Sequence, residues 1–273
     1  HIFDDEQSFI DYVRSSTPDV VVNDILDTSA EYVESLQKYT PRVVNFEDLG
    51  SGINQADAVI NALYEYSNPP ENHYFGFEYF CLRDEFMYAS PRKEIPSVDR
   101  IMISFGGTDE NNLTQKTLRA LSDIDLELHF DVVLGLGYTK QGSLASITST
   151  YRSNIEIDIN QNIKSMGKHM EQADLIITSN GRTLYEAAGL NVPAISIAQN
   201  HREQKHPYAH VSAGVSFLGQ ADYVTERNIL SAVKDYISDG KKREKMHTAL
   251  ESHDIANGIE RIKKIIFKQA DED

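Results

Sequence analysis

The chain has 273 residues, of which 40% are hydrophobic and 25% charged, as is ordinary for a globular protein with an ample core. Its 26 basic and 42 acidic residues give a net charge of −16, which argues against a nucleic acid or an anionic membrane as partner. The single cysteine, Cys81, excludes an intrachain disulfide and favours a cytoplasmic location, and no apolar run is long enough for a membrane span.

The first part of the chain alternates helical and extended patterns. We expect a helix over residues 5–15 and another over 29–37, and strands over 18–24, 41–48 and 57–61. A loop is expected at residues 68–72, and a proline-containing linker near 90–96. These few strands predict a partial, truncated Rossmann-like domain over residues 1–92.

The alternation restarts after the linker and continues to the C-terminus. The expected strands cover 100–105, 126–134, 154–158, 174–178 and 193–197, and the expected helices cover 111–121, 163–172, a segment from 183, and 202–213. The tail from residue 226 is expected to be mostly helical, with a core-facing stripe of Ile259, Ile262, Ile265 and Ile266. The pattern predicts a complete Rossmann-like domain over residues 97–273 and, for the whole chain, an α/β fold with mainly parallel sheets.

A glycine pair follows the first strand of this second domain. Gly106 and Gly107 permit a tight turn and a close approach of a ligand to the backbone. Thr108 can cap the next helix or donate a hydrogen bond to a phosphate. A glycine pair after a strand is equally typical of a simple turn, so both interpretations remain open.

Residues 179–186 form a second junction between a strand and a helix. Ser179 or Asn180 can cap the helix and Gly181 allows a tight bend, while Thr183 and Glu186 share one helix face. Helix N-termini bind anions through free N–H groups and the helix dipole, and a carboxylate one turn later suits a sugar hydroxyl. The alternative is a capping box in which Thr183 caps the helix and Glu186 reaches back.

A polar run, residues 199–206, follows the strand expected at 193–197 and contains Glu203 and Gln204. Ligands of open α/β sheets bind at the carboxyl ends of the strands, so the three loops are expected to meet at one site. The alternative for this run is a solvated loop.

The remaining polar clusters favour structural roles. His206 and His210 have helical spacing but lack the zinc-protease pattern, so they are expected to be surface residues, and no metal site is predicted. The four acids Asp24, Asp27, Asp48 and Asp57 follow or border strands and are expected mainly to cap the helices that come next. No motif indicates a cofactor, a serine hydrolase or a P-loop enzyme.

Several of these segments carry a resemblance to a known family. Residues 98–109, 76–86, 44–48 and 173–193 resemble the PseG-like UDP-sugar hydrolases of pseudaminic acid biosynthesis and, more distantly, MurG and the GT-B superfamily. The resemblance implies a GT-B-like pair of Rossmann-like units, a UDP-sugar as the small-molecule ligand, and a role in the biosynthesis of sialic-acid-like sugars of surface polysaccharides.

The resemblance also implies roles for individual residues. Gly106, Gly107 and Thr108 would face the diphosphate or the sugar. Donors to the phosphates would come from Ser179, Asn180, Gly181 and Thr183. Glu186 would bind the ribose hydroxyls, and Glu203 and Gln204 would contact the sugar or phosphate, with the sugar as the safer assignment for the acidic Glu203.

The N-terminus departs from the family pattern. The family begins with a strand and a Gly-x-Gly-His loop that carries the general base, and nothing before residue 20 matches, so no catalytic residue is assigned and the role is not given to His1. We expect either that the chain belongs to a longer protein, such as a fusion with a cytidylyltransferase, or that the catalytic half of the site is lost. The leading hypothesis is hydrolysis of a UDP-deoxysugar. The alternatives are a MurG-like glycosyltransferase and a non-catalytic, regulatory nucleotide-sugar-binding domain.

Overall fold

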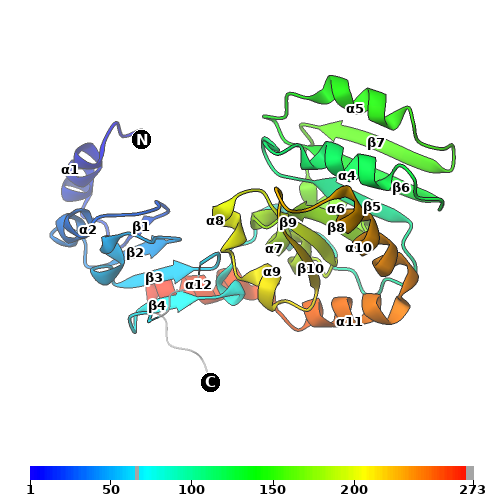
Figure 1. Ribbon diagram of the computed structural model, residues 1–273. Helices are drawn as coiled ribbons and strands as arrows, with labels where there is room; N and C mark the ends of the chain where they lie inside the picture. The colour runs from blue at the N-terminus through cyan, green and yellow to red at the C-terminus, as the bar shows by residue number, and fades with distance from the viewer. Residues whose placement is uncertain (65–67, 269–273) are drawn as a thin grey trace. The chain divides into compact units, whose positions relative to one another are not determined.

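A computed structural model describes residues 1–64 and 68–268 (Figure 1). The chain divides into two compact units, the first comprising His1–Cys81 with the C-terminal segment from Asn257, and the second Leu82–Ala256. Each unit contains one wholly parallel sheet, of four strands in the first and six in the second. The expected α/β fold with two Rossmann-like units, each built on a parallel sheet, is therefore confirmed.

The first unit has the strand order β1-β2-β3-β4. Its main elements are α1 (Glu6–Ser16), β1 (Val21–Asn23), α2 (Ala30–Gln37), β2 (Val43–Phe46), β3 (Ala58–Asn61), β4 (His73–Phe75) and α12 (Gly258–Phe267). Short 3-10 turns, η1 (Ser51–Asn54) and η2 (Phe77–Tyr79), follow β2 and β4.

Alternation along the strands of the first unit gives its sheet two buried faces. Val43 and Val59 pack with Val33 and Leu36 of α2 on one face. The opposite face buries Val44 and Ile60 against Ile262 of α12, with Ile265 and Ile266 alongside. The expected core role is thus confirmed for Ile262, Ile265 and Ile266. Arg42 donates to the carbonyl oxygens of Ile265 and Ile266, at 2.6 and 2.9 Å, and so satisfies the C-terminal end of α12.

The second unit has the strand order β10-β9-β8-β5-β6-β7. Its strands are β5 (Arg100–Ser104), β6 (Leu128–Leu134), β7 (Ile155–Gln161), β8 (Leu175–Ser179), β9 (Ala194–Ala198) and β10 (Val215–Gln220). Its helices are α3 (Asp84–Met87), α4 (Leu113–Leu121), α5 (Gln141–Thr148), α6 (Met166–Gln172), α7 (Arg182–Gly189), α8 (His201–Gln204), α9 (Tyr208–Val211), α10 (Glu226–Ser238) and α11 (Gly240–Glu251), and η3 (Ile255–Asn257) follows them. This is the order of a doubly wound sheet: from β5 the chain adds β6 and β7 on one side, and then β8, β9 and β10 on the other side. The strand order therefore reverses between β5 and β8.

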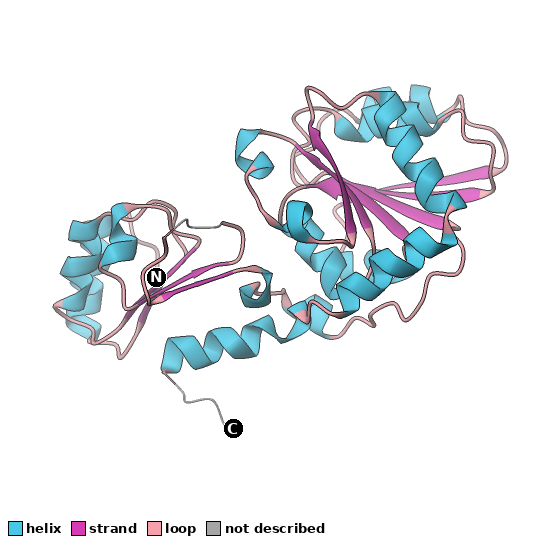
Figure 2. Cartoon of the chain, turned by 60° about the horizontal axis from the view of Figure 1, so that its bottom comes forward, coloured by secondary structure: helices cyan, strands magenta, loops and turns pink. Residues whose placement is uncertain are grey.

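Helices cover both faces of this sheet (Figure 2). On one face, α4, α5 and α10 pack side by side through Leu118, Leu144 and Val233, over Ile103 and Phe130 of the strands. On the other face, α6 and α7 contact the central strands β5, β8 and β9. The central strands are buried on both faces, which explains why they read as unbroken apolar runs in the sequence.

The structure differs from the sequence-based expectations in several elements. β4, α5 and β10 were not expected, and the helix expected over residues 202–213 is divided into α8 and α9 by Pro207, whose missing N–H and fixed φ interrupt a helix. The first compact unit ends at Cys81 and includes α12, whereas the expected domains were 1–92 and 97–273. The C-terminal helix joins the first unit because its apolar face packs on β2 and β3.

Candidate functional site

Three loops leave the sheet of the second unit at its point of reversal. They follow β5, β8 and β9, whose carboxyl ends lie side by side because Ser104 pairs with Thr178 and Thr178 with Ser196 in the ladder. All six strands are parallel, so these loops share one edge of the sheet. This edge is where open α/β sheets bind their ligands.

The loop after β5 is a glycine turn with its backbone exposed. Gly106 has φ of 75°, and a Cβ added at Gly106 or Gly107 would meet no protein atom within 4 Å. Within the part of the chain that the structure describes, the N–H groups of Gly106, Gly107 and Thr108 have no protein acceptor. Three successive free amides beside open space form a concave donor surface of the kind that binds anions.

Asp109 closes this loop onto α4. Its buried carboxylate accepts hydrogen bonds from the backbone N–H groups of Leu113 and Thr114, at 2.8 and 2.9 Å. The capping role that the sequence offered to Thr108 therefore belongs to Asp109. Thr108 is exposed, and its side chain is not used as a cap.

The loop after β8 leads into α7 without a side-chain cap. Gly181 occupies the N-cap position and no side chain accepts from the first turn, so the capping box of Thr183 and Glu186 is not formed. The Leu184 N–H donates to Gly181 O at 3.1 Å, whereas the Thr183 N–H has no acceptor among the described residues and keeps its capacity to bind an anion. Thr183 is half-buried in this turn.

Asn180 and His206 fix the conformation of this loop through hydrogen bonds to the segment after β9. The Asn180 side-chain amide donates to the carbonyl oxygens of Glu203 and His206, at 2.7 and 3.2 Å, and His206 Nδ1 donates back to Asn180 O at 2.6 Å. Both residues are buried, and burial lowers the pKa of His206. The expectation that His206 is a surface residue was wrong, because its ring is buried and hydrogen-bonded to the backbone of this loop.

Glu203 occupies the same loop from the side of α8. Its carboxylate accepts hydrogen bonds from the Gln199 N–H at 2.8 Å, the Asn180 N–H and the Ser179 hydroxyl. Burial raises the pKa of Glu203, and these hydrogen bonds oppose the rise. The Gln199 side chain donates to Phe105 O at 2.8 Å, so one segment ties all three loops together.

Glu186 and Gln204 are placed differently from these loop residues. Glu186 is only 6% exposed, and its Oε1 accepts from Arg83 Nε at 2.9 Å. Burial raises the pKa of Glu186, and the Arg83 guanidinium opposes that rise. Gln204 is half-buried next to Glu203, and its Oε1 accepts no hydrogen bond from the described residues.

A cavity of about 270 Å³ opens beside the glycine turn, under the loops that follow β6 and β7. Gly106 and Gly107 form one wall, and the remaining lining is mainly apolar, from Ser104, Val133, Leu134, Gly135, Leu136, Asn162, Ile163 and Met166. The sequence reasoning missed these lining residues. The run Gly135-Leu136-Gly137 was the available signal, since a Cβ at Gly135 would lie 2.3 Å from the carbonyl oxygens of Gly106 and Gly107.

The first unit has a buried polar network at the carboxyl ends of its own strands. Asp48 is fully buried and accepts from Thr28 N, Gly50 N and Asn45 Nδ2 at 2.9, 2.8 and 2.7 Å, and also from the Thr28 hydroxyl. Asn45 Oδ1 accepts from Asn23 of the neighbouring strand at 2.9 Å. Asp48 is therefore a buried structural acceptor rather than a helix cap.

Among the described residues, the other acids and histidines predicted from the sequence do not form a metal-binding cluster with these groups. The Asp57 carboxylate accepts a hydrogen bond from the Val43 N–H at 2.8 Å and so satisfies a backbone donor at the start of β2. His210 Nε2 contacts Gln204 O at 3.0 Å, while His206 Nδ1 faces Asn180, so the two histidines do not converge on one point. None of the helices in the described ranges combines the length and apolar character needed to cross a bilayer.

Two curated relatives are similar to this chain in sequence. Uncharacterized protein MJ1062 of Methanocaldococcus jannaschii is 30% identical over 215 residues, which cover 74% of this chain and 44% of that protein. The spore coat polysaccharide biosynthesis protein SpsG of Bacillus subtilis is 24% identical over 249 residues, 86% of this chain and 72% of SpsG. The chain thus spans less than half the length of the first relative.

Solved structures share the fold. MurG of Acinetobacter baumannii superposes with a TM-score of 0.72 at 16% identity, over 97% of this chain and 79% of MurG. The UDP-GlcNAc 2-epimerase of Neisseria meningitidis, solved bound to UDP-GlcNAc, gives a TM-score of 0.62 at 14% identity, over 97% of this chain and 80% of the epimerase. At these identities the likeness establishes the GT-B-like architecture alone.

The family model of the glycosyltransferase family 28 C-terminal domain matches residues 101–262. This segment runs from β5 into α12 and includes the glycine turn, the β8–α7 loop and the loop after β9. It covers more than half of the 273 residues, and the chain therefore belongs to the glycosyltransferase family 28 C-terminal domain family.

Proposed function

We propose that the second unit binds a UDP-sugar at the carboxyl edge of its six-stranded sheet. The observation that carries this proposal is the row of three free amides at Gly106–Thr108, which borders an apolar cavity of about 270 Å³. Amides of this kind suit a diphosphate, and a mainly apolar cavity next to them suits a nucleobase. The epimerase that shares the fold was solved with UDP-GlcNAc, which supports uridine as the nucleoside.

The predicted donors contribute unequally to this site. The Ser179 hydroxyl and the Asn180 N–H already donate to the Glu203 carboxylate, so they shape the loop. Gly181 and Thr183, in the uncapped start of α7, remain as phosphate donors beside the glycine turn. Glu186 is proposed as the ribose ligand and Gln204, whose Oε1 has no protein donor among the described residues, as a contact to the sugar.

We propose hydrolysis of the UDP-linked sugar as the reaction. Water attacks the anomeric carbon, the bond to the β-phosphate oxygen breaks, and UDP leaves with the electron pair of that bond. The free amides and the α7 dipole stabilise the charge that develops on the leaving UDP. A base must accept the proton of the water. His206 is not assigned this role because its Nδ1 is engaged with Asn180 O.

Transfer to a sugar hydroxyl is the second candidate reaction. The match to a glycosyltransferase family model favours it, and the chemistry at the UDP group is the same because only the attacking oxygen differs. Similarity to SpsG supports a place in polysaccharide biosynthesis for either reaction. A fusion or partnership with a cytidylyltransferase, and a role in nonulosonic acid biosynthesis, are part of the hydrolase proposal.

Calorimetric titration with UDP tests the binding site. UDP should bind with micromolar to millimolar affinity, uridine more weakly because it lacks the phosphates, and ADP more weakly because its base differs. Thr183→Val and Glu186→Ala should each weaken UDP binding, whereas Thr148→Val, at a half-buried threonine at the end of α5, should not. If UDP does not bind at millimolar concentration, the proposed site is wrong.

Release of UDP from UDP-N-acetylglucosamine and related UDP-deoxysugars distinguishes the reactions. Consumption without an added acceptor supports the hydrolase, and consumption only with an acceptor supports the transferase. Binding of UDP without turnover in the full-length protein supports a regulatory domain and refutes both reactions.

A further inference from the structure

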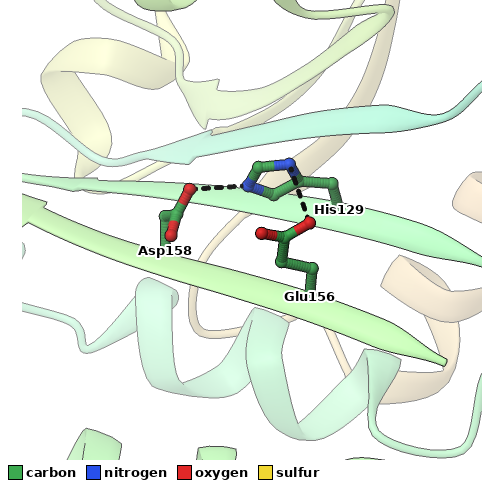
Figure 3. A group of neighbouring side chains, drawn as sticks. All are labelled: His129, Glu156 and Asp158. Carbon is green, nitrogen blue, oxygen red and sulfur yellow. Dashed lines mark hydrogen bonds and ion pairs between the residues drawn. The ribbon is translucent and has the colours of Figure 1, made fainter. Parts of the chain in front are cut away.

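A separate cluster of potential metal ligands lies on the outer strands of the six-stranded sheet, away from the glycine turn. His129 of β6 and Glu156 of β7 are direct partners in the parallel ladder, and Asp158 follows two residues further along β7. The three side chains point to the same face of the sheet (Figure 3), and one ligand atom from each lies within 4.8 Å of the others. The cluster has no role in the proposed nucleotide site.

The hydrogen bond between His129 and Asp158 determines the tautomer of the imidazole. His129 Nε2 lies 2.8 Å from Asp158 Oδ2, which only accepts hydrogen bonds, and 3.2 Å from Arg100 Nη2, which only donates; we assign the ring proton to Nε2 on the basis of the shorter contact. The lone pair of the neutral ring is then on Nδ1. Nδ1 faces Glu156 Oε2 at 3.7 Å, so two acceptors point toward each other (Figure 3).

A cation bound between Nδ1 and the Glu156 carboxylate would accept electron pairs from both atoms and so remove the repulsion between them. Zinc bonds to histidine nitrogen and carboxylate oxygen are about 2.0–2.2 Å long, which separates two ligands of a tetrahedral ion by about 3.4 Å. The 3.7 Å between Nδ1 and Glu156 is close to that separation. A carboxylate that accepts from the distal ring N–H is the usual support of a metal-bound histidine, and Asp158 provides it.

The surroundings of Nδ1 are acidic and open. His129 and Glu156 line a surface depression of about 650 Å³, and Asp99 and Glu127 line it as well. Arg100 lies on the Nε2 side of the ring instead, with Nη2 3.2 Å from Nε2 and 3.8 Å from Asp158 Oδ2. Its charge supports the ionised Asp158 carboxylate and leaves the Nδ1 side to a cation.

We propose that His129 Nδ1 and the Glu156 carboxylate bind a divalent transition-metal ion of the zinc class, with Asp158 as the positioning residue for the imidazole. Imidazole and carboxylate are the ligands that select such ions, and water or the other acids of the depression complete the coordination. Because the two protein ligands lie on adjacent strands, the ion would tie the edge strand β7 to β6.

Zinc titration of the metal-free full chain tests this proposal. We expect one saturable site, and a rise in Tm on zinc addition because the ion binds the folded state alone. His129→Gln and Glu156→Gln should abolish both effects. Asp158→Asn should weaken zinc binding by about tenfold or more, the usual effect of removing an orienting carboxylate. Circular dichroism of each variant establishes that it is folded.

His169→Gln is the matched control. His169 Nδ1 also meets a carboxylate, Asp131, at 2.7 Å, but Asp131 is buried and its second oxygen accepts from Asn160, so no acceptor pair is left facing a gap. This variant should bind zinc like the wild type. Equal zinc affinity in the wild type and His129→Gln would overturn the proposal and indicate diffuse binding to an acidic surface. Absence of saturable zinc binding would also overturn it.

Discussion

Replacement of Gly107 by alanine should change the affinity for UDP without lowering the folding stability. A Cβ at Gly107 meets no protein atom within 4 Å, and the backbone of this residue does not have the positive φ that would strain alanine. The added methyl group therefore enters open space next to the free amides of the glycine turn. If a phosphate binds there, the methyl group must displace it.

The expected magnitudes follow from these contacts. Folding stability should stay the same or rise by about 0.4–1 kcal/mol, because alanine restricts the unfolded chain more than glycine does. A hydrogen bond to a charged group contributes about 1.5–3 kcal/mol, and a displaced phosphate loses at least one. Since about 1.4 kcal/mol corresponds to a tenfold change in affinity, UDP should bind roughly ten to a hundred times more weakly.

The assay pairs UDP calorimetry with urea unfolding of the same protein samples. Gly142→Ala, on α5, is the control, because its Cβ also meets nothing within 4 Å but lies outside the proposed site. It should leave UDP binding unchanged and stabilise the helix slightly. If Gly107→Ala binds UDP as tightly as the wild type, phosphate does not approach this turn and the site must be placed elsewhere.

Three further changes test neighbouring parts of the structure. Gly135→Ala should destabilise the protein by about 1–3 kcal/mol in urea unfolding and weaken UDP binding, because its Cβ would lie 2.3 Å from two carbonyl oxygens of the glycine turn; an unchanged midpoint would contradict this. Glu186 has a pKa raised by burial, so its stabilising contribution is present below its unfolded pKa and lost as pH rises through the folded pKa. Glu186→Gln should therefore lose part of the stability that the wild type gains between neutral pH and about pH 4.3, measured by thermal unfolding, whereas the half-exposed Glu251→Gln should not. Asp48→Asn should cost about 2–4 kcal/mol, because an amide group replaces one of two buried acceptor oxygens; a loss no larger than that of Asp57→Asn would refute its structural role.

The sequence predicted the parts of the fold that depend on local pattern. Apolar runs bounded by polar residues located most strands, including β5, β8 and β9, and the glycines marked the turns that follow two of them. β10 was missed because its residues are all half-buried and give neither an alternating nor a continuous apolar pattern. The split between α8 and α9 had a local signal in Pro207, which the periodicity of the segment outweighed.

The roles of the site residues were harder to predict because they depend on tertiary contacts. Nothing in the local sequence indicates that Glu203 reaches the β8–α7 loop or that Glu186 pairs with Arg83, a residue 103 positions away in the chain. Most of the cavity lining comes from the end of β6 and from the loops after β6 and β7, and its mainly apolar side chains gave no chemical signal. Motifs indicated the loops at which we propose the ligand site, but not which donors are already occupied.

The occupied donors restrict where the negative charge of a ligand can lie. Glu203 places a carboxylate on the Asn180 N–H and the Ser179 hydroxyl, and a phosphate at the same donors would bring two anions together in a partly buried loop. Burial already raises the pKa of Glu203, so a second negative charge next to it would be more costly still. The amides of Gly106–Thr108 carry no such competitor. The diphosphate is therefore expected at the glycine turn, while Glu203, Asn180 and His206 hold the neighbouring helix start in place before any ligand arrives.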